Sequence, residues 1–251
     1  MTPRARAAIE SSDTVVGYTT YIKLIRPLIA GQQVVSTGMK AEADRCKDAV
    51  RLASEGRRVA LVSSGDAGVY GMAGLVLEII KEGNPPHPPL TKGGKGGFAG
   101  PESGEIPFDF EVVPGIPAVC SSAASLGAPL MHDFAVVSLS DLLTPWELIL
   151  KRLDAAAGAD FVIALYNPRS KGRPDNLDEA RRVISRHRPG DTPVGIVKDS
   201  RREGEKVIIT TLTALPVDEV DMTTMVIIGN SQSYRFMDYI VTPRGYKGKR
   251  F

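Results

Sequence analysis

The chain has 251 residues, of which 43% are hydrophobic, and its 31 Lys and Arg against 29 Asp and Glu leave a net charge of +2. This length suits one large α/β domain or two small ones, and the charge balance gives no field that would by itself recruit nucleic acid. No apolar run approaches the roughly 20 residues that span a bilayer, and the N-terminus lacks a signal-peptide pattern, so a cytoplasmic protein without a membrane anchor is expected.

Short β-branched runs alternate with helical patterns along the chain, which is typical of a largely parallel sheet covered by helices. The expected strands, in chain order, are residues 14–17, 33–36, 58–63, 110–113, 134–139, 161–166, 194–198, 207–211 and 225–229. Apolar residues at three- and four-residue spacing predict helices over 43–53 and 177–184. The sequence therefore indicates an α/β fold.

One segment interrupts this alternation, because about half of residues 83–106 are Gly or Pro, which disfavours a packed element. We interpret this segment as a flexible surface insertion; a linker between domains is the alternative. The strand expected at 110–113 would then end the first domain, so the predicted domains are 1–114 and 115–251. The polar and basic tail from Ser231 onward is expected to be partly disordered.

Two loops have the composition of ligand-binding turns. In RVALVSSGDAGVYGMA (58–73) an apolar strand leads into a loop with Gly65, Gly68 and Gly71. Glycines let the backbone approach a ligand closely, although a merely tight turn is the alternative. The spacing is neither GxGxxG nor a Walker A loop, so a nicotinamide or ATP site has little support. The run 110–130 repeats the plan with a Pro-Gly turn and a helix of small residues.

Taken together, SSGDAGVYGMA and EVVPGIPAVCSSAASLGAPL closely resemble the two signature regions of the tetrapyrrole methylase family, the class III adenosylmethionine-dependent methyltransferases. Further segments resemble the members that methylate precorrin-3B at carbon 17: VVGYTTYIKLI, VSLSDLLTPW, IALYNPRSKGRPDNL, VIITTL and IIGNSQSY. The resemblance implies two α/β domains with a cofactor cleft between them. It also implies S-adenosylmethionine as cofactor, a tetrapyrrole substrate and a homodimer. Methyl transfer from a sulfonium needs no metal, and the near-neutral charge balance argues against a nucleic acid partner.

The resemblance also assigns roles to single residues. The implied cofactor contacts are Ser64, Gly65, Asp66, Val69, Pro117, Ala118, Tyr166 and Thr210. Relatives often have Thr in place of Pro117, so at this position only a backbone contact is expected.

Three basic residues are expected to bind the substrate, which bears many carboxylates. Arg169 is the main candidate, with Lys171 and Arg173 adding to it, and a solvated basic loop is the alternative. The candidates for proton transfer are His132, Asp141 and Tyr18, although His132 could be an exposed loop residue and Asp141 a helix cap.

The chain differs from the family pattern at its start. Family members open with a strand and a GxGPGxx turn, whereas this sequence begins with the helix-like TPRARAAIE, so the first strand is expected to be missing. We favour a start further upstream over a compromised protein, because the remaining motifs are intact. Alternative functions are methylation of another precorrin carbon, of ribosomal RNA ribose or of diphthine, and a degenerate non-catalytic remnant. The segment YNPRSKGRPDNL (166–177) favours carbon 17, with ring contraction expected to accompany methylation.

Overall fold

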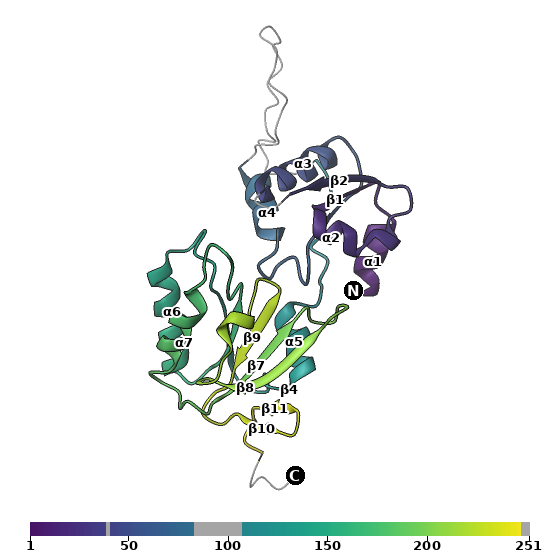
Figure 1. Ribbon diagram of the computed structural model, residues 1–251. Coiled ribbons are helices and arrows are strands. Elements are labelled where there is room, and N and C mark those ends of the chain that lie inside the picture. The colour runs from purple at the N-terminus through teal and green to yellow at the C-terminus, as the bar shows by residue number, and fades with distance from the viewer. Residues whose placement is uncertain (39–40, 83–106, 247–251) are drawn as a thin grey trace. The chain divides into compact units, whose positions relative to one another are not determined.

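The computed structural model describes residues 1–38, 41–82 and 107–246, and the chain divides into two compact units, Met1–Pro117 and Ala118–Phe251 (Figure 1). The expected insertion at 83–106 and the end of the tail at 247–251 lie outside the described residues. Within the described part, no helix is long and apolar enough to cross a bilayer.

The first unit alternates helices and strands. Its elements are α1 (Pro3–Glu10), β1 (Thr14–Tyr18), α2 (Thr19–Leu24), the 3-10 helix η1 (Arg26–Leu28), β2 (Gln33–Thr37), α3 (Glu42–Ser54), β3 (Val59–Val62) and α4 (Ala73–Lys81). The strands form a parallel sheet in the order β2-β1-β3, with Thr14 of β1 opposite Gln33 on one side and Val59 on the other.

Both faces of this sheet are covered, which explains the unbroken apolar character of β1. Val15 is fully buried against Ile9 of α1 and Ile22 of α2. Val16, also fully buried, points to the opposite face and packs with Leu52 of α3. The sheet thus positions the carboxyl ends of its parallel strands along one edge, where the loops that follow them begin.

The second unit contains a larger sheet. Its elements are α5 (Ala118–Leu126), β4 (Gly127–Ala128), β5 (Phe134–Ser138), α6 (Trp146–Gly158), β6 (Val162–Tyr166), α7 (Asn176–Ile184), β7 (Pro193–Lys198), β8 (Lys206–Thr211), the 3-10 helix η2 (Val217–Glu219), β9 (Thr224–Ile228), β10 (Tyr234–Phe236) and β11 (Tyr239–Val241). The 5-stranded sheet has the order β5-β6-β9-β7-β8. A small second sheet has the order β10-β11-β4.

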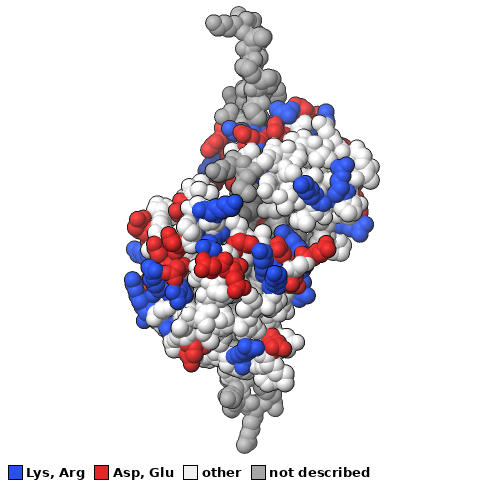
Figure 2. Space-filling view, in the orientation of Figure 1, with Lys and Arg blue, Asp and Glu red and all other residues white. Residues whose placement is uncertain are grey.

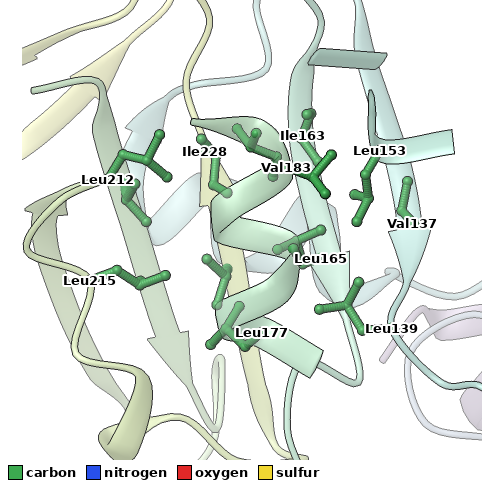
Figure 3. Packing of buried hydrophobic residues seen from close by; sticks show 14 of the residues in the cluster. Val137, Leu139, Leu153, Ile163, Leu165, Leu177, Val183, Leu212, Leu215 and Ile228 are labelled. Carbon is green, nitrogen blue, oxygen red and sulfur yellow. The ribbon is translucent and has the colours of Figure 1, made fainter. Parts of the chain in front are cut away.

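The main core of the second unit lies between the five-stranded sheet and the helices α6 and α7 (Figure 3). Ile163 and Leu165 of β6 point to this side and pack with Leu153 of α6 and Leu177 of α7. The alternate β6 residues, including Ala164, face α5 on the other side of the sheet. Because β6 is buried on both faces, its sequence is a continuous apolar run.

Three expectations about the fold need correction. The sheet of the second unit is mixed and not largely parallel, because β9 runs antiparallel to both β6 and β7 and β8 runs antiparallel to β7. Residues 110–113 form no strand: Phe110 instead packs against the α3 and α4 cluster, and Glu111 pairs with Arg4. The tail from Ser231 is ordered through β10 and β11, because β11 pairs with β4 and buries Ile240.

Candidate functional site

The glycine-rich loop after β3 follows the carboxyl end of a parallel strand, where α/β proteins bind ligands. Gly65 has a φ of +75°, a backbone conformation that residues other than glycine rarely adopt. Its backbone is exposed. The Asp66 carboxylate shapes the turn, because its Oδ1 accepts a 2.8 Å hydrogen bond from the Gly68 backbone N–H. Val69 donates its N–H to the Asp66 carbonyl at 3.3 Å. The loop therefore presents exposed, glycine-lined backbone.

The second predicted loop meets the first within the same unit. The Gly115 N–H donates a 2.8 Å hydrogen bond to Oδ2 of Asp66. A Cβ atom added to Gly115 would lie 1.9 Å from the Gly65 carbonyl oxygen, so only glycine fits this contact. One oxygen of Asp66 thus shapes its own loop and the other joins that loop to the second one, a role that the sequence did not indicate. A direct cofactor contact from Asp66 remains a prediction.

In the second unit, α5 begins immediately after Pro117 with Ala118. The Tyr166 hydroxyl, at the end of β6, accepts a 3.0 Å hydrogen bond from the Val119 backbone N–H. This bond satisfies one of the first N–H groups of the helix, which have no partner within the helix itself. Tyr166 and Ala118 are therefore close to each other, as expected for two residues of one binding surface.

Thr210 lies elsewhere in the sheet. Thr210 pairs with Val194 of β7, and Val194 pairs with Ile228 of β9 on its other side. Ile228 in turn pairs with Ile163, near the start of β6. Tyr166 lies at the other end of β6, beyond these paired rows. Strand register thus separates Thr210 from Tyr166, and a cofactor contact at Thr210 gains no support from this geometry.

The same sheet edge as Tyr166 includes a loop that sequence reasoning missed. β7 runs parallel to β6, because both are antiparallel to β9, so the residues after Lys198 emerge at the carboxyl end of the sheet. Asp199 and Asn167, which follow these two strands, have φ values of 49° and 51°. Ser200 donates a 3.0 Å hydrogen bond to Ser121 of α5. The polar run directly after the apolar β7 strand was the available signal.

The basic loop after β6 is more internally bonded than its sequence suggests. Arg169 donates to the Pro174 carbonyl, the Asp218 carbonyl and the Asp218 carboxylate, at 3.2, 3.2 and 2.9 Å. In contrast, Nη1 of Arg173 is buried and makes no hydrogen bond among the described residues, with Oδ1 of Asp141 3.7 Å away. Lys171 is exposed. Arg173 is therefore held beside Asp141, and Arg169 (26% exposed) is the more accessible of the two arginines.

Two of the proposed proton-transfer residues, His132 and Asp141, lie beyond opposite ends of β5, and the third, Tyr18, belongs to the other unit. Asp141 does not cap a helix, because α6 begins after Pro145, and it pairs with Arg173 instead. His132 lies in an exposed loop, where Nδ1 accepts the Asp133 N–H at 2.9 Å. Tyr18, in the first unit, ends β1 and lies beneath the Arg45 guanidinium, 5.8 Å from the ring centroid. Catalytic roles for these residues remain predictions.

Charge and metal-ligand chemistry add little to these sites. On the face shown in Figure 2, acidic and basic side chains lie interspersed. Among the described residues, no cluster of His, Cys, Asp and Glu side chains could hold a metal ion. The candidate surfaces are lined by glycine backbone, small residues and hydroxyl groups.

Two α/β units with a glycine-rich loop at the carboxyl end of a parallel strand are typical of the class of α/β proteins that bind small ligands there. The family model described as Tetrapyrrole (Corrin/Porphyrin) Methylases matches residues 1–87 and 102–216. The chain belongs to this family, which confirms the resemblance inferred from its motifs. Residues 88–101, within the expected insertion, lie between the two matched ranges.

Individual relatives are similar over nearly the whole chain. The probable cobalt-factor III C(17)-methyltransferase of Salmonella typhimurium is 44% identical over 98% of this chain and 93% of its own length. The cobalt-factor III methyltransferase of Priestia megaterium is 49% identical over 99% of this chain, which spans only 43% of that relative. The crystal structure of the methyltransferase CobJ matches with a TM-score of 0.84 and 32% identity, covering 97% of this chain and 93% of CobJ.

Proposed function

We propose that this protein methylates a precorrin-3-type tetrapyrrole at carbon 17, with S-adenosylmethionine as donor, in cobalamin biosynthesis. The main support is the 44% identity to a relative named as a C(17)-methyltransferase, of which this chain covers 93%. We also propose that the same protein contracts the tetrapyrrole ring. Both relatives described above are named for cobalt-factor III, which favours a cobalt-carrying substrate over precorrin-3B.

The residues of the glycine-rich loop fit a nucleoside cofactor. When bound, S-adenosylmethionine supplies an electrophilic methyl group on a sulfonium, and the transfer to carbon needs an aligned approach but no metal. Gly65 offers exposed backbone without a Cβ, and the Asp66 bond to Gly115 holds this loop against the next one. We propose that Ser64, Gly65, Asp66 and Val69 bind the donor, together with Pro117, Ala118 and Tyr166. Their task is to bind and orient it while excluding water.

Substrate carboxylates would be bound by the loop after β6. We propose Arg169 as the main contact, because its side chain is 26% exposed, whereas Nη1 of Arg173 is buried beside Asp141. Arg173 would mainly hold the loop in place through Ser170 and Asp141. Lys171 would add a weaker attraction that salt screens, since it is exposed.

We also propose a cytoplasmic homodimer that binds neither nucleic acid nor membrane. Exposed aromatic and Met side chains on the hairpin β10–β11, including Phe236 (55% exposed) and Met237 (72%), support a self-association surface. The interspersed charges in Figure 2 offer no broad basic face for RNA on the side shown.

The decisive experiment incubates the purified protein with S-adenosylmethionine and either cobalt-factor III or precorrin-3B, and measures product mass. Gain of one methyl group, located at carbon 17 by NMR, is the expected result. Gly65→Val should abolish product formation, because a β-branched residue is strained at this positive φ and would block the backbone approach. Methylation of a different carbon or substrate would refute the assignment, and failure to bind the cofactor at all would indicate a degenerate remnant.

A further inference from the structure

Three large apolar side chains are exposed at one end of the five-stranded sheet. Leu142 and Leu143, in the loop that follows β5, are 72% and 95% exposed, and Met222, just before β9, is 45% exposed. Single exposed apolar residues are ordinary on a protein surface, whereas a cluster of them indicates a site that binds a ligand or a partner. The residues that lie between these three therefore indicate what the surface binds.

Three segments of the second unit meet at this end of the sheet. β5 and β6 are parallel, so the loops that follow them emerge on the same side. β9 is antiparallel to β6, so the segment that precedes β9 lies at the same end. Because the strand order is β5-β6-β9, the basic loop after β6 lies between the loop with the two leucines and the segment with Met222.

Arg173, in the middle loop, contacts the segments on both sides. Its Nη1 lies 3.7 Å from Oδ1 of Asp141, the residue before Leu142. Its Nη2 donates to the sulfur of Met222 at 3.5 Å. One side chain thus joins the two apolar segments to the basic loop. We call the combined surface of Leu142, Leu143, Met222 and the loop 169–173 the amphiphilic surface.

The cations of the amphiphilic surface are only partly neutralised. Arg169 pairs with Asp218, and Arg173 lies beside Asp141. Lys171 is exposed and forms no ion pair among the described residues. A ligand with carboxylates at its rim and an apolar body would match both parts of this surface, because each part would meet a group of complementary chemistry.

We propose that Leu142, Leu143 and Met222 contact the ring face of the tetrapyrrole, while the basic loop beside them binds its peripheral carboxylates. The proposal rests on the methyltransferase function proposed above and adds residues that determine specificity for a macrocycle. Contact between the ring and these side chains removes apolar surface of both from water. The carboxylates near the cations fix the orientation of the ring on the surface.

The test combines Leu142→Ser with Leu143→Ser and uses Leu77→Ser, on α4 and 48% exposed, as the control. Calorimetry at several temperatures would measure the binding of uroporphyrin III, an octacarboxylate macrocycle, and of S-adenosylhomocysteine. The double variant should bind uroporphyrin III about tenfold more weakly and with a less negative heat-capacity change, because less apolar surface is buried. Its affinity for S-adenosylhomocysteine should be unchanged, and the control should bind both probes like the wild type.

A double variant that binds uroporphyrin III with the affinity and heat-capacity change of the wild type would overturn the proposal. Normal binding together with a smaller sedimenting species would also overturn it, since a second copy of the chain would then cover the leucines. If the double variant does not fold, Leu143→Ser alone decides: weaker uroporphyrin III binding supports the contact, and unchanged binding refutes it.

The same measurements separate this proposal from the proposed function. A wild type that methylates its tetrapyrrole, while the double variant binds uroporphyrin III normally, would refute the ring contact alone. A wild type that neither binds uroporphyrin III nor methylates a precorrin would refute both.

Discussion

At the level of single residues, the candidate cofactor loop depends on the contact between Asp66 and Gly115. Both carboxylate oxygens of Asp66 accept backbone N–H groups, one from its own loop and one from a residue 49 positions further along the chain. These two hydrogen bonds fix the loop, and the carboxylate keeps lone pairs that can accept a further hydrogen bond from a ligand. The glycine-rich turn is thus held in place by hydrogen bonds and close packing.

Gly115→Ala tests this coupling. The added methyl group would lie 1.9 Å from the Gly65 carbonyl oxygen, so the backbone of one loop must move. We expect a loss of about 1–3 kcal/mol in the free energy of unfolding, which is typical of overpacking, and weaker binding of S-adenosylhomocysteine. Gly74→Ala in α4 is the matched control, because nothing lies within 4 Å of its added Cβ. The control should raise stability by about 0.5–1 kcal/mol. If both variants showed the same change in the free energy of unfolding in denaturant titrations, the coupling between the two loops would be contradicted.

The two arginines after β6 should differ in what they do. We expect Arg169→Ala to weaken substrate binding about tenfold or more, which corresponds to about 1.4 kcal/mol, because Arg169 is the more exposed of the two arginines. Arg173→Ala should mainly lower stability, since the buried Nη1 of Arg173 lies beside Asp141. Uroporphyrin III titrations and thermal melts of both variants separate the effects. The reverse order of substrate affinities would make Arg173 the principal contact.

At the level of secondary structure elements, Asp221 joins the carboxyl end of β7 to the start of β9. Its carboxylate accepts from Lys198 Nζ at 2.6 Å, from the Thr223 N–H at 2.9 Å and from the Thr224 hydroxyl at 3.0 Å. Burial would raise the pKa of Asp221, but the hydrogen bonds, first of all that from Lys198, outweigh it and lower the pKa to about 2. The ionised carboxylate therefore stabilises this junction.

This depressed pKa gives a pH dependence with a defined sign. Because the folded pKa of Asp221 is below the unfolded value of about 3.9, its stabilisation is complete above about pH 4 and is lost as the pH falls toward 2. The side chain is 46% exposed, so solvent screening should limit the effect to about 1 kcal/mol or less. Asp221→Asn should accordingly be less stable near neutral pH and lose less stability than the wild type between pH 4 and 2. If the wild type and Asp221→Asn lost the same stability between pH 4 and 2 in urea titrations, the assigned role of the Asp221 carboxylate would be wrong. Asp238→Asn, at a highly exposed position, is the control.

At the level of the whole molecule, we expect self-association through the hairpin β10–β11. β10 is the edge strand of its sheet, and its residues Tyr234 and Phe236 are 48% and 55% exposed. Edge strands with exposed apolar side chains tend to pair, and soluble oligomers are mostly two-fold dimers. Tyr234→Lys combined with Phe236→Lys should convert a dimer to a monomer in sedimentation velocity experiments. Leu77→Lys, at a comparably exposed position on α4, should leave the dimer intact; a monomeric wild type would refute the expectation.

Sequence alone could predict much of the fold, because its signals are local. Buried strands such as β1 and β6 are continuous apolar runs, and helices such as α3 repeat apolar residues at helical spacing. The same locality caused the errors. Residues 110–113 have the composition of a strand, but hydrogen bonding to a neighbouring strand is a non-local event, and Phe110 packs on helices instead.

The amino-acid sequence by itself determined the strands β1–β3 and β5–β9, the glycine-rich loop and the family, since each of these is written in short contiguous patterns. Only the tertiary structure decided what depends on residues far apart in the chain. Strand register separates Thr210 from Tyr166, and the insertion of β9 between β6 and β7 makes the sheet mixed. Likewise, the burial of Arg45 among neutral groups follows from how α3 packs on its sheet, because a charge is compensated or left unbalanced only by what lies beside it in space.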